Sequence, residues 1–96
     1  MFKSSVKRKL TNTSDEIKKV QHELDILDEQ VVYFDGIADE NRLRALVSET
    51  PMAEKEYNES RRTLEALIRD QDVHLAKLVK LEQRQNELLD KLSGLK

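Results

Sequence analysis

His74 and Asp70 are the two residues whose types and spacing could support metal or proton chemistry. They lie four residues apart, one turn of a helix, so an imidazole nitrogen and a carboxylate could bind the same divalent metal. The imidazole could instead act as a pH switch, because histidine titrates near neutral pH. A metal site needs more than two protein ligands, and no second carboxylate–histidine pair faces these residues. We therefore predict that His74 is a polar residue of the core and that the protein has no metal site.

No other pattern predicts catalysis. The sequence has no cysteine, which excludes disulfides, a Cys-based zinc site and a thiol nucleophile. It has no Gly-rich phosphate loop, and no serine or threonine has the His and Asp partners of a nucleophilic triad. We expect a protein that is not an enzyme and that has no catalytic residues, no cofactor and no small-molecule substrate.

The composition is that of a helical protein with a thin core. Of the 96 residues, 36 are charged (17 Lys and Arg, 19 Asp and Glu), whereas the chain has two glycines, one proline and four aromatic residues. This composition favours long helices and coiled coils and leaves little apolar material to form a pocket. The apolar runs are too short for a transmembrane span or a secretory signal, so we predict a cytoplasmic protein.

Core-type residues recur at alternating steps of four and three in two series. The first series spans residues 6–41 and the second spans residues 57–95, and this is the heptad spacing of coiled coils. The two series are separated by Thr50 and Pro51, which is typical of a helix N-cap followed by proline at the first helical position. The sequence therefore predicts two helices that are separated near Pro51.

Pairing the two series predicts the fold. In an antiparallel arrangement the numbers of facing residues add to 98 throughout, which puts the turn at residue 49, within the breaker segment 48–51. The facing pairs are Phe34/Leu64, Val31/Leu67, Leu24/His74, Val20/Leu78, Ile17/Leu81, Leu10/Leu88 and Val6/Leu92. We predict an all-α protein whose residues 1–96 form one domain, an antiparallel two-helix coiled-coil hairpin. Its expected elements are helices over about 5–47 and 51–93 and a turn at 48–51, and dimerisation would give a four-helix bundle.

Two positions bear on the continuity of the first helix. Thr13 with Glu16 three residues later resembles a capping box, so the residues before it either fray or continue the helix. Gly36 costs about 1 kcal/mol relative to alanine inside a helix. Because the pairing holds on both sides of Gly36, we predict a continuous helix. Polar residues also enter the seam, where we expect them to specify register, in the pairs Thr13/Gln85, Leu24/His74 and Leu27/Gln71.

Seven apolar residues outside the seam form two partial stripes, one on each helix. A two-stranded seam is too narrow to bury them, and in water they would form an apolar patch of the kind that marks an interface. We predict self-association as a homodimer in preference to binding of a helix from another protein. These residues, called the outer stripe below, are Ile68, Leu75, Val79 and Leu89 of the second helix and Ile26, Tyr33 and Ile37 of the first.

The tip of the hairpin is a second candidate surface. Apolar residues gather there beside acidic ones, and they either pack on one another to close the end of the hairpin or form a docking surface. The candidate tip residues are Leu43, Leu46, Val47, Glu49, Met52 and Glu54. Together, the outer stripe and the tip predict a structural or adaptor protein that acts through protein–protein interaction.

A two-helix coiled coil with acidic residues at its tip, followed by Glu56 and Tyr57, resembles the N-terminal hairpin of Gre-type transcript-cleavage factors. Proteins of that family insert the tip into the secondary channel of RNA polymerase, where tip carboxylates hold a catalytic magnesium. With Tyr57 aligned on the family's tyrosine, Thr50 and Ala53 occupy two positions that are acidic in the family. The resemblance implies polymerase-channel binding as an alternative function.

Charge is distributed unevenly along the chain. Residues 1–14 carry a net charge of +4, residues 15–59 of −8 and residues 60–96 of +2. The basic segment 1–10 could contact an anionic membrane or nucleic acid. Four charges anchor only weakly, however, so we expect a solvated helix start and keep these contacts as a further alternative. The basic residues of this segment are Lys3, Lys7, Arg8 and Lys9.

Overall fold

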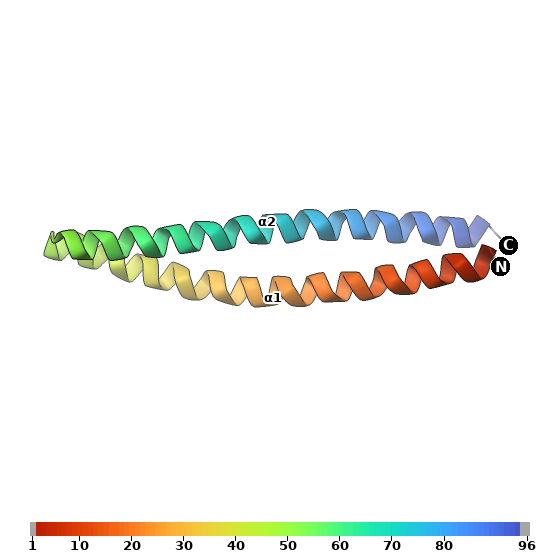
Figure 1. The fold of residues 1–96 in the computed structure, drawn as a ribbon, viewed down its shortest axis with the longest axis horizontal. Helices are drawn as coiled ribbons and strands as arrows, with labels where there is room; N and C mark the ends of the chain where they lie inside the picture. Colours follow the sequence, from red (N-terminus) through yellow and green to blue (C-terminus); the bar gives the residue numbers. More distant parts are fainter. Residues whose placement is uncertain (1, 95–96) are drawn as a thin grey trace. The chain divides into compact units, whose positions relative to one another are not determined.

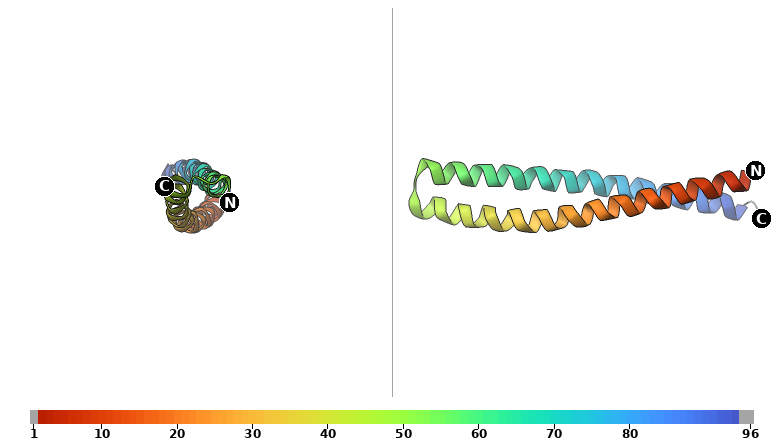
Figure 2. Two further views of the ribbon diagram at one scale, coloured as in Figure 1. Left: turned by 90° about the vertical axis from the view of Figure 1, so that its left-hand side faces the viewer. Right: turned by 60° about the horizontal axis from the view of Figure 1, so that its bottom comes forward.

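The computed structural model describes residues 2–94, which form two long α-helices. Helix α1 spans Phe2–Ser48 and helix α2 spans Pro51–Gly94. The two helices run antiparallel and pack against each other, with the start of α1 beside the end of α2 (Figures 1 and 2). The predicted all-α helical hairpin is therefore confirmed. The last residue of the second series, Leu95, lies outside the described residues, as does Met1 of the basic segment.

Helix α1 begins a turn earlier than the expected start near residue 5, at Phe2. Thr13 is an interior residue of this helix and not its cap, because its hydroxyl donates a hydrogen bond to the Lys9 carbonyl (2.8 Å). Its side chain is buried, as a seam position requires. The chain before Thr13 therefore continues the helix, the second of the two outcomes that the capping pattern leaves open.

The turn between the helices consists of Glu49 and Thr50. Glu49 has a φ of 51°, the left-handed conformation that often ends a helix, and its N–H donates to the Ala45 carbonyl (3.1 Å). The Thr50 hydroxyl accepts a hydrogen bond from the Ala53 N–H (3.2 Å), and Pro51 is the first residue of α2. The N-cap and the proline position predicted from the sequence are thus both present.

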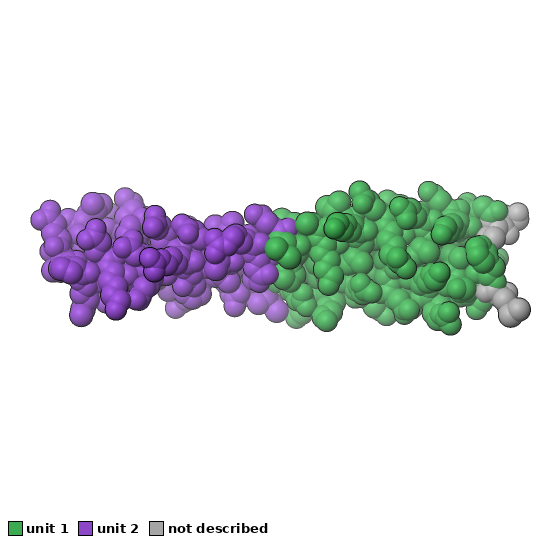
Figure 3. All heavy atoms as spheres, turned by 45° about the horizontal axis from the view of Figure 1, so that its top comes forward, with its two compact units in different colours: residues 1–24, 73–96 green, residues 25–72 purple. Residues whose placement is uncertain are grey.

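Packing divides the chain into two compact units (Figure 3). Unit 1 comprises Met1–Leu24 and Val73–Lys96, and unit 2 comprises Asp25–Asp72. Each unit contains one segment of α1 and one of α2, with a seam of its own. Each unit is described separately below.

The seam of unit 1 is built from branched aliphatic side chains. Ile17, Val20, Leu24 and Leu81 form one buried cluster, and Leu78 packs against it. Val20 is the best covered of these residues, with 2% of its surface exposed. All five belong to the two heptad series, so burial in this unit follows the predicted pairing.

The seam of unit 2 contains smaller side chains. Its buried positions are Leu27, Ala38, Ala53 and Ser60, whereas the larger seam residues of this unit, such as Phe34, are only half-buried. The hydrogen bonds and ion pairs that join the helices in the two units test the register. The residue numbers of each joined pair add to a value close to the predicted 98. The sums are 97 for Glu23/His74, 99 for Asp28/Gln71, 100 for Arg44/Glu56 and 101 for Asn41/Ser60.

Replacing Gly36 with alanine should stabilise the protein. Gly36 is an exposed residue inside α1 with a negative φ, and a Cβ built on it would meet no atom within 4 Å. Alanine would restrict the unfolded chain without any clash, so we expect Gly36→Ala to raise the free energy of unfolding by about 0.5–1 kcal/mol. Urea denaturation followed by far-UV circular dichroism would measure the change. Gly94→Ala, at the last residue of α2, is the control and should have a smaller effect. A loss of stability at Gly36 would show that α1 needs a flexible point there.

Candidate interaction surfaces

His74 forms a polar layer within unit 1. Its Nε2 lies 2.9 Å from Oε2 of Glu23, and the two side chains are 20% and 38% exposed, respectively. The imidazole thus lies at the edge of the seam and pairs with a carboxylate on the facing helix. Among residues 2–94, no group of three or more His, Asp or Glu side chains is arranged to hold a metal ion.

Polar contacts between the helices mark both flanks of the unit 2 seam. On one flank, Gln71 Nε2 donates to Asp28 Oδ1 (2.7 Å). On the other, Arg44 Nη1 lies 3.5 Å from Glu56 Oε2. Residues that lie one heptad apart share a flank. We call these two sides of unit 2 the Asp28 flank and the Arg44 flank.

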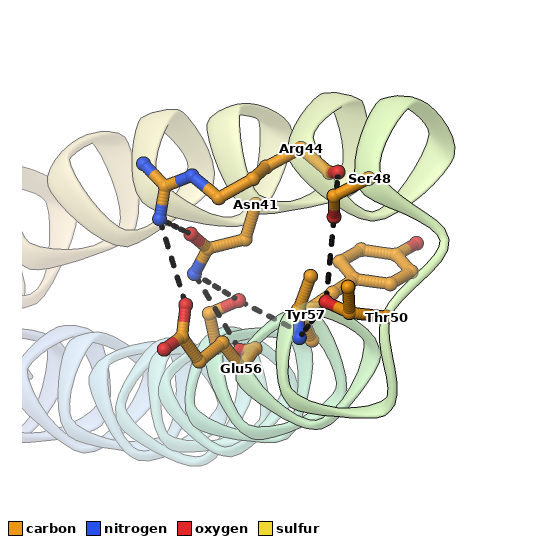
Figure 4. Close-up of polar contacts among 8 residues, drawn as sticks. Asn41, Arg44, Ser48, Thr50, Glu56 and Tyr57 are labelled. Carbon is orange, nitrogen blue, oxygen red and sulfur yellow. Dashed lines mark hydrogen bonds and ion pairs between the residues drawn. The ribbon is translucent and has the colours of Figure 1, made fainter.

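The turn end of unit 2 is held by a small polar network (Figure 4). Asn41 Nδ2 donates to Ser60 Oγ (3.2 Å) and to the Glu56 carbonyl (3.5 Å), and Ser60 Oγ donates to the Tyr57 carbonyl (2.9 Å). The Arg44–Glu56 pair lies beside Asn41. Its side chains are 60% and 46% exposed, so solvent screens the pair and its contribution to stability is small. The network specifies the pairing of the helices next to the turn.

The apolar tip residues do not close the end of the hairpin. All four remain exposed, from 52% for Leu43 to 86% for Val47, with Leu46 and Met52 between these values. Ala53 is the buried residue at this end instead. The acidic tip residues Glu49 and Glu54 are exposed as well. Glu54 lies in the first turn of α2, where its carboxylate interacts favourably with the positive end of the helix dipole. The apolar and acidic tip residues are therefore all accessible at the surface of unit 2.

The two positions at which the Gre-type family has acidic residues carry none here. The Thr50 hydroxyl caps α2, and Ala53 is buried, with 6% of its surface exposed. The pair of tip carboxylates that this resemblance would imply is therefore absent at these two positions.

The outer-stripe residues of unit 2 lie on opposite flanks. A hollow on the Asp28 flank is lined by Asp35 and Arg61, which lie one heptad from Asp28 and Ile68, respectively. Ile68 therefore lies on the Asp28 flank. Ile37 lies one heptad before Arg44, on the opposite flank, and it is only half-buried. Ile26 and Tyr33 are both exposed and lie along the Arg44 flank. The ring of Tyr33 packs edge-on against the ring of Phe34, with the ring centroids 5.3 Å apart.

The outer-stripe residues of unit 1 share one flank. Arg84 lines a hollow together with Lys9 and Glu16. Because Glu16 lies one heptad before Glu23, this hollow lies on the flank of the Glu23–His74 pair. Glu82 precedes Arg84 by two residues, about 200° around the helix, and therefore lies on the opposite flank. Leu75 and Leu89 lie one heptad on either side of Glu82, and they are 50% and 48% exposed. Val79, which is 55% exposed, lies one turn after Leu75.

Sequence reasoning missed three exposed apolar residues. Val32 and Val73 are 74% and 64% exposed, and Phe2 is also open to solvent. Neither valine has a large apolar residue one heptad before or after it, so neither belongs to an outer repeat. Their positions outside the seam could have predicted their exposure, because a two-helix hairpin buries few residues other than those of its seam.

The basic N-terminal residues belong to a larger basic surface. Lys3, Lys7, Arg8 and Lys9 are exposed residues of α1 and occupy unit 1. The sequence of unit 1 contains 11 Lys and Arg and 6 Asp and Glu, a net charge of +5, whereas that of unit 2 contains 6 and 13, a net charge of −7. The charge therefore divides along the same boundary as the packing, which segment counts from the sequence did not show.

Comparisons with known proteins identify no relative. The chain matches no protein family, no curated protein and no solved structure. Within the described residues, neither helix has an apolar stretch that could cross a membrane.

Proposed function

We propose that the protein is a non-enzymatic coiled-coil structural or adaptor protein that self-associates through apolar residues outside its seam. The observation that carries this proposal is the exposure of Leu75, Val79 and Leu89 on a single helix of unit 1. These side chains lie on one flank and leave about half of their surface in water. Exposed aliphatic side chains that recur along one flank of a helix favour a protein–protein interface.

The thin seam explains why a second layer of packing is favourable. The buried cluster of unit 1 contains four apolar residues, so the two helices alone cover little apolar surface. Packing two hairpins together would bury the outer residues of both, as in a four-helix bundle. A second copy always supplies a matching surface, and symmetric homodimers are the commonest soluble oligomers.

The test is the oligomeric state of a variant in which the apolar flank of unit 1 is charged. We expect the wild-type chain to dimerise at tens of micromolar in sedimentation equilibrium. The double variant Leu75→Glu, Leu89→Glu should raise the dimer dissociation constant by about tenfold or more, because it would bury unpaired carboxylates. The helix content should persist, because both side chains lie outside the seam.

Gln83→Glu is the matched control, since it adds a carboxylate at an exposed position of α2 between the two altered residues. It should leave the dissociation constant nearly unchanged. A wild-type chain that stays monomeric at these concentrations would refute self-association, and a protein partner would become the leading explanation. Loss of helicity in the double variant would instead show that Leu75 and Leu89 belong to the core.

A further inference from the structure

The two units carry opposite charge at their surfaces. Unit 1 has a net charge of +5 and unit 2 of −7. Every described charged side chain is exposed except Glu23, which is half-buried. These charges are therefore available to a partner, and their sign differs between the units.

The bases of unit 1 are not neutralised within the chain. Among its described residues, no lysine or arginine forms an ion pair with a carboxylate. The described ion pairs of lysine and arginine all lie in unit 2, which still has seven more acidic than basic residues. Both units therefore present uncompensated charge, positive in one and negative in the other.

Each unit also has a flank on which charge and exposed apolar residues coincide. In unit 1 this is the flank of Leu75, Val79 and Leu89, which also carries Glu82. Lys7 and Lys18 of α1 lie on this flank as well, because each is two residues, about 200°, from a residue of the Glu23 flank. In unit 2 it is the Asp28 flank, where Ile68 is exposed and Asp39 lines the same hollow as Asp35. Val32 lies one heptad before Asp39, so it belongs to this flank as well. On the Asp28 flank the acidic residues Asp28, Asp35 and Asp39 outnumber Arg42 and Arg61, the two basic residues that line the same hollow.

We propose that two copies of this chain pack antiparallel, so that unit 1 of each copy covers unit 2 of the other. The apolar flank of unit 1 would lie against the Asp28 flank of unit 2. In this orientation both contacts join charges of +5 and −7. A parallel pairing would instead place like charges together in both contacts, and like-charge juxtaposition is unfavourable. The arrangement has the two-fold symmetry of an isologous dimer. This proposal rests on the self-association proposed above. It adds the orientation of the two copies and the electrostatic attraction that favours this orientation.

Single cysteine labels would measure the orientation, because the natural chain has no cysteine. Thr63 of unit 2 and Gln83 of unit 1 are exposed residues of α2, each ten positions from Val73. Chains with Gln83→Cys would carry an energy-transfer donor. They would be mixed with acceptor-labelled chains that carry either Thr63→Cys or Gln83→Cys. We expect the 83–63 mixture to give the higher transfer efficiency.

Salt dependence is the second measurement. Attraction between oppositely charged units is screened by salt, with a Debye length of about 10 Å at 0.1 M. We expect the dimer dissociation constant to rise by about tenfold between low and high salt, measured by sedimentation equilibrium. Labelled chains with Leu75→Glu and Leu89→Glu provide the background, because they should give little transfer in either mixture.

The outcomes separate the orientation from self-association itself. Higher transfer in the 83–83 mixture, or a dissociation constant that falls as salt is added, would overturn the antiparallel orientation and leave the dimer standing. A chain that is monomeric at every concentration and salt level would overturn both proposals.

Discussion

Leu81→Ala is expected to lower the free energy of unfolding by about 2–5 kcal/mol. Leu81 is one of four residues in the buried cluster of unit 1, and it packs against Ile17, Val20 and Leu24 with 8% of its surface exposed. Truncation would remove buried methyl groups and leave a cavity between two long helices. Domains of this size are stable by only about 5–15 kcal/mol, so the loss would be a large part of the total.

Urea denaturation followed by far-UV circular dichroism would measure this effect. Leu43→Ala is the matched control, because it is the same substitution at a helical position that is 52% exposed and lies outside the proposed dimer contact. It should change stability by no more than about 0.5 kcal/mol. Equal losses at the two positions would show that the seam does not dominate the stability of the hairpin.

Thr50→Ala is expected to destabilise the protein by about 0.5–2 kcal/mol through loss of the α2 cap. The Thr50 hydroxyl accepts a hydrogen bond from the Ala53 N–H, one of the backbone donors that has no partner inside the helix. Alanine would leave this donor to solvent at the point where the chain reverses direction. The same denaturation experiment would measure the change.

Thr50→Asp is the control for the cap. The aspartate carboxylate can accept the same hydrogen bond and also interacts favourably with the positive end of the helix dipole. The free energy of unfolding of this variant should therefore be close to that of the natural chain. If the aspartate variant were as unstable as the alanine variant, the hydroxyl contact would not be the reason for the loss.

The hairpin could be predicted from the sequence because its signals are local. Core-type residues at heptad spacing identify the seam, and Thr50 with Pro51 identifies where α2 begins. The start of α1 was less certain because Thr13 with Glu16 is a capping pattern. In the structure Thr13 is buried, and its hydroxyl bonds back to Lys9 within a continuous helix. A residue with a local capping pattern can therefore lie inside a helix when it also occupies a buried seam position.

The candidate surfaces were only partly predictable. The outer stripe consists of residues that miss the seam, which periodicity can identify, and six of its seven members are exposed. The exception is Ile37, which lies one heptad before Arg44 and is half-buried. Val32 and Val73 were missed because neither has a large apolar residue one heptad before or after it. The tip residues left two outcomes open, since exposure there depends on how the turn directs the chain.

By itself, the sequence determined the two helices, their antiparallel pairing and the position of the turn, because each depends on spacing along one chain. Only the tertiary structure decided which flank each outer residue occupies, since this requires the rotation of both helices at their contact. It also decided that Ile68 and Ile37 face opposite ways in unit 2. The division of charge into a basic and an acidic unit emerged only with packing, because each unit joins segments that are distant in sequence.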